Sequence, residues 1–165
     1  MTASNAWLLE CSDTLAIAVS DQEMVEFIDT PLRFEVPGSP EYCSAVVLWQ
    51  DNLIPIMDIA VLLGNPPDET KTRVNLLTYQ ENPGEDLQQL AISVVRAPQK
   101  IQVDDEQASE LPEQIINSVL MPLSLSCFSH GGKPVLILDV ARLGSAEFRD
   151  IANDDQSLLE RSAGF

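Results

Sequence analysis

The amino-acid sequence predicts a mainly β protein, a barrel or a sandwich, and three observations support this prediction. Short apolar runs recur along the 165-residue chain, and polar turns or turns with glycine and proline separate them. Little of the chain has the apolar spacing of a helix, so alternating strand–helix units are not expected. One apolar segment also occurs twice, about half the chain apart, which indicates two similar halves.

The first expected elements are a hairpin and a short helix. Trp7–Cys11 and Leu15–Val19 are apolar runs joined by a polar turn, as in two antiparallel strands. Ser20 and Glu23 have the spacing of a capping box, in which each side chain satisfies a backbone N–H at a helix start. The sequence therefore predicts a helix that Ser20 caps and that continues to Ile28.

The next segment is expected to be extended, because the three prolines between residues 31 and 40 each remove a backbone donor. Tyr42–Trp49 and Leu53–Met57 then predict a second hairpin, with residues 50–52 as its turn. A short helical turn over Ile59–Leu63 is expected to end at Gly64, where a left-handed residue is favoured.

The second half of the chain continues this pattern of short strands and turns. Its expected strands are Arg73–Tyr79, Leu87–Val95, Ile101–Val103, Ser124–Ser129 and Pro134–Leu138, the last two joined by a turn over residues 130–133. Residues 104–113 form an acidic, solvated loop, and residues 145–165 form an acidic tail that is partly helical or frayed.

The repeated segment comprises residues 54–62 and 135–143, which lie 81 residues apart. Each copy is an apolar run followed by Asp, a β-branched residue, Ala, any residue and Leu. Asp58 and Asp139 each follow an apolar strand, so their side chains can cap the helical turn that comes next. This structural role is preferred to the alternative, a paired-carboxylate acid–base site.

The charge balance excludes several classes of partner. Nine basic and 26 acidic side chains give a formal net charge of −17, and no cluster of Lys and Arg interrupts it. Such a field repels nucleic acid and anionic lipid head groups. The start of the chain lacks a positively charged secretory region, and no apolar run approaches the roughly 20 residues of a membrane-spanning helix. A cytoplasmic location without membrane insertion is expected by exclusion.

No set of residues predicts catalysis. His130 is the only histidine and falls in a predicted turn. Cys11, Cys43 and Cys127 are widely spaced, so they are interpreted as reduced thiols that pack as small apolar groups. Zinc, calcium and nucleotide-binding motifs are missing from the sequence. We therefore expect no enzyme activity, no cofactor and no metal.

Several motifs resemble those of the CheW-like family. Members carry a proline-framed loop, a strand and turn reading G-V-x-N-L-R-G, and then x-V-I-P-V-x-D-L; Val36–Tyr42 and Leu53–Ile59 resemble the first and last of these. Val135–Leu143 resembles the closing L-I-L-x-D-x-x-x-L segment, and Met24–Ile28 loosely matches V-x-E-I. The resemblance covers residues 7–144, which we expect to form one domain followed by the tail.

The resemblance implies a fold and a function. The family consists of two similar, intertwined five-stranded β-barrel subdomains with short helices. Its members couple chemoreceptor tips to a histidine kinase. The implied protein is a non-catalytic cytoplasmic scaffold whose groove between the halves receives a receptor helix and whose barrel end pairs with the regulatory domain of the kinase. Self-association is left open.

Departures from the family motifs make this chain a divergent member. Where the family has G-V-x-N-L-R-G, Ala45–Asp51 reads A-V-V-L-W-Q-D, so the arginine position is Gln50. Glutamine cannot replace the planar guanidinium fork. Two alternatives follow: a CheW-like binding module that serves another regulatory or pilus-related partner, and, with less support, a small hydrolase that uses a carboxylate.

Five residues are candidates for partner binding: Val25, Phe27, Val46, Trp49 and Gln50. Trp49 lies at a predicted hairpin tip and Phe27 at a predicted helix end, where large apolar groups can anchor a partner. Burial in the core is the alternative interpretation for both. Val46 and Val47 alternate along a strand, so only one of them can face a groove.

Overall fold

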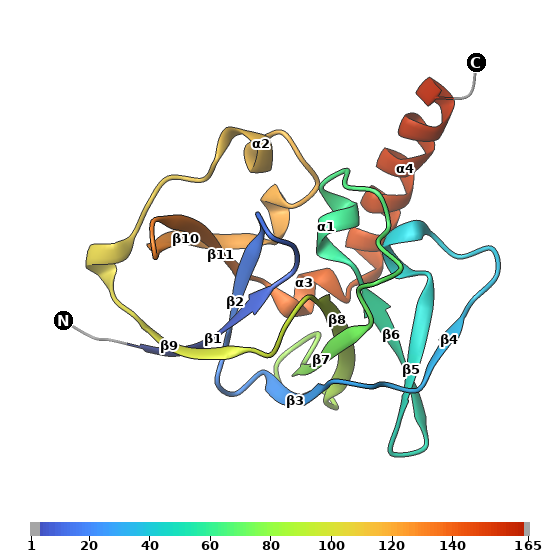
Figure 1. Ribbon diagram of the computed structural model, residues 1–165, viewed down its shortest axis with the longest axis horizontal. Helices are drawn as coiled ribbons and strands as arrows, with labels where there is room; N and C mark the ends of the chain where they lie inside the picture. The colour runs from blue at the N-terminus through green and yellow to red at the C-terminus, as the bar shows by residue number, and fades with distance from the viewer. Residues whose placement is uncertain (1–3, 164–165) are drawn as a thin grey trace.

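The computed structural model describes residues 4–163, with residues 105 and 155–163 described as backbone alone. The described chain forms two sheets (Figure 1). A five-stranded sheet contains β1 (Ser4–Glu10), β2 (Ala16–Ser20), β9 (Gln99–Val103), β10 (Ser124–His130) and β11 (Lys133–Leu138). A six-stranded sheet contains β3 (Met24–Ile28), β4 (Arg33–Glu35), β5 (Ala45–Trp49), β6 (Asn52–Met57), β7 (Arg73–Tyr79) and β8 (Gln88–Val94).

Helices are short apart from the last one. The α-helices are α1 (Ile59–Leu62), α2 (Glu113–Ile116), α3 (Val140–Leu143) and α4 (Ala146–Ala163), and the 3-10 helices are η1 (Glu41–Cys43), η2 (Asp105–Gln107) and η3 (Met121–Leu123). The mainly β class is confirmed, and so are the hairpins β1–β2, β5–β6 and β10–β11; β7 and β8 also pair as an antiparallel hairpin. None of the helices within residues 4–163 is long and apolar enough to cross a bilayer.

The two sheets are built alike. The strand orders match: one sheet contains β5-β6-β8-β7-β3 and the other β10-β11-β2-β1-β9. In each order only the second neighbouring pair, β6–β8 or β11–β2, is parallel, and the other three pairs are antiparallel. Two similar halves are therefore confirmed. They differ by one strand, because β4 adds a sixth to one sheet by pairing with β5. The ladders leave both sheets open at their ends.

The two halves also interleave along the chain. β1 and β2 pair with β9 and β11, so the first hairpin belongs to the same sheet as the last strands, whereas β3–β8 form the other sheet (Figure 1). The largest apolar cluster draws buried side chains from both sheets, and also from α1, α3 and α4. Each sheet has in addition a smaller apolar cluster of its own. The two halves therefore share one core.

Both hairpin turns of the repeat contain two residues, not the three and four expected from the sequence. The strands continue to the pairs Trp49–Asn52 and His130–Lys133, which leaves only residues 50–51 and 131–132 in the turns. All four turn residues have positive φ, which is the geometry of a type I′ turn. This turn has a twist that matches the twist of paired strands, and the ladders can therefore extend to its edge.

The predicted helix from Ser20 to Ile28 is wrong, because residues 24–28 form β3. The capping-box hydrogen bonds do exist: the Ser20 N–H donates to Glu23 Oε1 at 3.0 Å, and the Glu23 N–H donates to Ser20 Oγ at 3.3 Å. They close a tight turn between β2 and β3. Beyond this turn, pairing with β7 supplies the backbone partners, and the residues Val25, Phe27 and Ile28 suit a strand.

The chain after residue 144 continues into the core. α4 begins at Ala146, and its Phe148 and Ala152 side chains are buried in the main apolar cluster. From there the helix extends beyond both sheets toward the C-terminus (Figure 1). The three cysteines are free thiols; Cys11 and Cys127 are buried and Cys43 is half-buried.

Candidate functional site

The outer surface of β4, β5 and β6 is apolar and exposed. Six residues form it, here called the β4–β6 face: Leu32, Phe34, Leu48 and Leu53 are exposed, and Val46 and Pro55 are half-buried. Across the strands, Phe34, Val46 and Pro55 form one row, and Leu48 and Leu53 form another. The Leu48 N–H donates to the Leu32 carbonyl at 3.0 Å, which places Leu32 at the end of the second row.

Strand periodicity explains why apolar groups lie on both sides of this sheet. Ala45 and Val47 alternate with Val46 and Leu48, and they are buried in the cluster on the inner side. A sheet with one solvated side normally alternates apolar and polar residues. Here Leu53 is 62% exposed and Phe34 is 47% exposed. A contiguous exposed apolar face of this kind is typical of a protein-binding surface.

Trp49 and Gln50 lie at the hairpin end of the β4–β6 face. The Trp49 ring is half-buried and packs against the inner cluster of the six-stranded sheet. Its Nε1–H donates to Glu26 Oε2 at 2.8 Å, which connects β5 to β3 across the curved sheet. Gln50 is exposed, with a φ of 48° as the first turn residue. The indole is therefore fixed by contacts within the chain itself, whereas the Gln50 side chain faces solvent.

Val25 and Phe27 lie elsewhere, on the edge strand β3. A shift of register between Met24 and Glu26 indicates a β-bulge, and the extra residue, Val25, is 37% exposed. Phe27 is half-buried and packs against the main core. The structure thus divides the five candidate residues between two places, and the Trp49–Glu26 hydrogen bond joins these places.

Beneath β3 lies a buried polar group that the sequence did not reveal. Asn75 on β7 is fully buried, and its Nδ2 donates to Met24 Sδ at 3.1 Å. No hydrogen bond to its Oδ1 is present among the described residues. A buried acceptor without a donor costs about 1–3 kcal/mol. Nothing in the sequence separates Asn75 from a surface asparagine, because its burial depends on distant strands.

Asp58 and Asp139 occupy equivalent places, at the N-caps of α1 and α3. Asp58 Oδ1 accepts from the Val61 N–H at 3.4 Å, and Asp139 Oδ1 accepts from the Arg142 N–H at 3.1 Å. Asp58 Oδ1 also accepts from Lys71 Nζ at 3.0 Å in a largely buried ion pair, a partner that the sequence analysis missed. Among the residues that the structure describes, no three His, Cys, Asp or Glu side chains are grouped as metal ligands would be.

The backbone N–H groups of the two aspartates also make equivalent hydrogen bonds. The Asp58 N–H donates to the Tyr42 carbonyl, and the Asp139 N–H donates to the Leu123 carbonyl, both at 2.7 Å. Donors and acceptors are thus each 81 residues apart, the spacing of the sequence repeat. The two aspartates are therefore equivalent members of two similar halves.

Comparisons with known proteins agree with this architecture. A protein-family model described as the CheW-like domain matches residues 8–148. The crystal structure of the scaffolding protein TtCheW from Thermoanaerobacter tengcongensis is similar, with a TM-score of 0.66 and 14% sequence identity over 89% of this chain and 96% of that chain. At this identity, the likeness concerns the fold. A search of curated protein sequences found no significant match.

Proposed function

The chain belongs to the CheW-like domain family, and from this premise we propose that it is an adaptor of a chemosensory system, coupling receptor tips to a histidine kinase. Domains of this family are non-catalytic scaffolds, so function depends on protein-binding surfaces. The observation that carries the proposal is the β4–β6 face, where four exposed and two half-buried apolar side chains form two adjacent rows. We place the adaptor in the cytoplasm, where the kinase and the receptor tips reside.

The β4–β6 face suits the kinase regulatory domain as its partner. Interfaces have an apolar centre that the partner covers, and Phe34 and Leu53 are 47% and 62% exposed on this face. β4 is also an edge strand, which a partner sheet could extend.

A second surface, around β3, suits the receptor tip. Val25 is exposed at the bulge, and β3 is an edge of the six-stranded sheet. An amphipathic helix binds through a few apolar anchors spaced along one face. We assign Val25 and Phe27 to this contact, and Val46, Trp49 and Gln50 to the end of the kinase contact.

The proposal can be tested by measuring the binding of the purified chain to a kinase regulatory domain and to a receptor cytoplasmic tip. Leu53→Ser should weaken kinase binding at least tenfold and leave the melting temperature unchanged, because the side chain is 62% exposed. Leu87→Ser is the matched control, since Leu87 is 61% exposed but lies outside the β4–β6 face. Equal loss in both variants would contradict the assignment of the face.

A second candidate function follows from Gln50. The family has arginine at this position, and glutamine here is exposed at a turn with no guanidinium to offer. A CheW-like module that has lost kinase and receptor coupling would keep the fold and serve another regulatory or pilus-related partner. Failure of the chain to bind either chemosensory partner at micromolar concentration would favour this alternative.

A further inference from the structure

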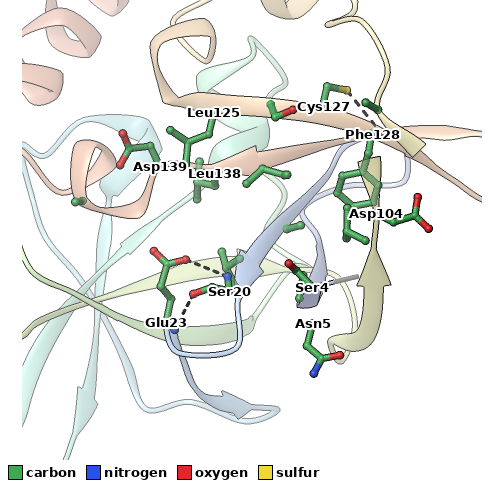
Figure 2. A pocket seen from close by; sticks show the side chains of 18 residues that line it. Ser4, Asn5, Ser20, Glu23, Asp104, Leu125, Cys127, Phe128, Leu138 and Asp139 are labelled. Atoms are coloured by element: carbon green, nitrogen blue, oxygen red, sulfur yellow. Dashed lines mark hydrogen bonds between the residues drawn. The ribbon is translucent and has the colours of Figure 1, made fainter. Parts of the chain in front are cut away.

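A pocket of about 440 Å³ opens at one end of the five-stranded sheet (Figure 2). Its walls are mostly apolar, with polar side chains on more than one side. The apolar lining includes Ala6, Ala18, Val103, Leu125, Phe128, Ile137 and Leu138. Figure 2 shows Glu23 and Asp139 on the same side of the pocket and Asp104 on the other side; the Asp104 carboxylate points away, and the Asp139 carboxylate turns toward the start of α3, where it accepts the Arg142 N–H. A volume of this size is suited to a small ligand.

The internal repeat identifies the counterpart of this pocket in the other half. A cavity of about 240 Å³ lies at the corresponding end of the six-stranded sheet. Four of its lining residues, Ser44, Ala45, Ile56 and Asp58, lie 81 positions before four residues of the larger pocket, Leu125, Ser126, Ile137 and Asp139. The parallel strand pairs give a fifth equivalence, between Ser93 and Ser20. The two cavities are therefore the same place in two similar halves.

One of these equivalent places has a lysine side chain in its wall. Residues 67–69 and Lys71 line the smaller cavity, and Lys71 is only 8% exposed. Its ammonium lies 3.0 Å from Asp58 Oδ1. The chain itself thus shows which chemistry this place accepts: an aliphatic stem that ends in a protonated amine beside the N-cap aspartate.

The equivalent aspartate in the other half has no such cation. Asp139 Oδ1 accepts the Arg142 N–H, and no ion pair joins it to a basic side chain among residues whose side chains the structure describes. Glu23 adds a second negative charge at this end, with Oε1 held by the Ser20 N–H. Two carboxylates beside apolar walls favour a ligand that is cationic at one end and apolar along the rest.

We propose that the pocket of the five-stranded sheet binds a small, protonated aliphatic amine. The ammonium contacts the Asp139 carboxylate, in the place that Lys71 Nζ takes beside Asp58 in the other half. The aliphatic part packs against Ala18, Phe128 and Ile137. This site is separate from the β4–β6 face, so the inference does not depend on the proposed adaptor function.

The first test compares three probes of equal length by NMR titration of the isotopically labelled chain. n-Hexylamine, with an ammonium that stays protonated at pH 7, should cause saturable shifts of the Ala18, Ile137 and Asp139 amide signals. 1-Hexanol should bind at least tenfold more weakly, and hexanoate should not saturate. Equal affinities of amine and alcohol, or non-saturating shifts over the whole acidic surface, would overturn the proposal.

A second test changes the charge and keeps the fold. Asp139→Asn preserves the oxygen that accepts the Arg142 N–H, and asparagine is an equally good N-cap. Hexylamine affinity should fall at least tenfold, to the level of hexanol, and hexanol affinity should not change. Asp68→Asn is the control, because it removes the same charge at an exposed position in the other half. A loss of equal size in the control would show non-specific attraction and contradict the site.

A third variant tests the pocket independently of Asp139. Ser126→Trp places a large ring at an exposed lining position, so both hexylamine and hexanol should lose saturable binding. This variant keeps the proposal testable if Asp139→Asn folds poorly. Unchanged binding in this variant would place the ligand elsewhere and overturn the proposal. Nα-acetyl-lysine amide should bind more weakly than hexylamine. Tighter binding would overturn the proposal of a small amine, because it would identify the ligand as a lysine side chain of a partner protein.

Discussion

Asp58 and Asp139 show at the residue scale how equivalent positions acquire different environments. Both were recognisable from the sequence, because each follows an apolar run and precedes a helical turn. Lys71, the partner of Asp58, was not recognisable, since it lies 13 positions along the chain in a loop. Local spacing predicts a cap, but an ion pair between two loops depends on how the chain folds back.

The first prediction concerns this ion pair. Lys71→Met removes the ammonium and leaves the Asp58 carboxylate with only the Val61 N–H, in a place where the Lys71 side chain is 4% exposed. Removing one partner of a buried pair should lower the free energy of unfolding by about 3 kcal/mol. Urea denaturation measures this loss. In the double variant with Asp58→Asn, most of it should be recovered; a double variant as unstable as the single one would contradict the ion-pair explanation.

The second prediction distinguishes the two glycines that follow the repeated segments. Gly64 has a φ of 102°, so it is a left-handed helix terminator as expected, whereas Gly144 has a φ of −81°. Gly144 is required for a different reason, because a Cβ there would overlap the Tyr79 hydroxyl and Cζ. Gly144→Ala should therefore lower the free energy of unfolding by about 1–3 kcal/mol, the range for overpacking.

Thermal and urea unfolding of Gly144→Ala test this contact, with Tyr79→Leu as the second change. Shortening the side chain makes room for the new methyl group, so the alanine should cost much less in the Tyr79→Leu background. If the cost is the same in both backgrounds, the contact with Tyr79 is not its cause.

At the scale of elements, β3 shows where sequence patterns are insufficient. Ser20 and Glu23 make the hydrogen bonds of a capping box, yet these bonds close a turn. The same local pattern is compatible with both outcomes, and the pairing of β3 with β7, about 50 residues later, decides between them. The hairpins were predictable because their partners are adjacent in sequence. The β4–β6 face was only partly predictable, since Leu32 and Phe34 join it through pairing with β5.

The third prediction concerns the β5–β6 turn. Gln50 and Asp51 both adopt positive φ, at 48° and 65°, and the equivalent residues of the other half are Gly131 and Gly132. Asn-Gly is the sequence that type I′ turns favour most. The variant Gln50→Asn with Asp51→Gly should raise the free energy of unfolding by about 1 kcal/mol, as relief of left-handed strain. A decrease, measured in urea, would show that the side chains of Gln50 or Asp51 stabilise the hairpin.

At the scale of the whole molecule, the chain places its two halves around one core. The repeat predicted that two similar units exist, but not that β1 and β2 complete the sheet of β9–β11. That assignment depends on the parallel pair β11–β2, which joins residues more than 100 positions apart and leaves no local signal. Because both sheets contribute to the main cluster, we expect them to unfold together.

Cys11 allows the integrity of this shared core to be tested by pH. The thiol is fully buried beside residues from both sheets, and burial raises its pKa from 9.0 to about 12. The unfolded chain releases this proton near pH 9 and the folded chain keeps it, so the thiol contributes stability that is complete below pH 9 and is lost as the pH rises toward 12.

Between pH 8 and pH 10, the free energy of unfolding of the native chain should fall by about 1.4 kcal/mol more than that of Cys11→Ala, which has no thiol to titrate. The comparison cancels the contributions of Tyr42, Cys43 and Tyr79, whose pKa values burial also raises. Equal losses in the two proteins would mean that the Cys11 thiolate reaches water in the folded state, and that the two sheets separate at this junction without global unfolding.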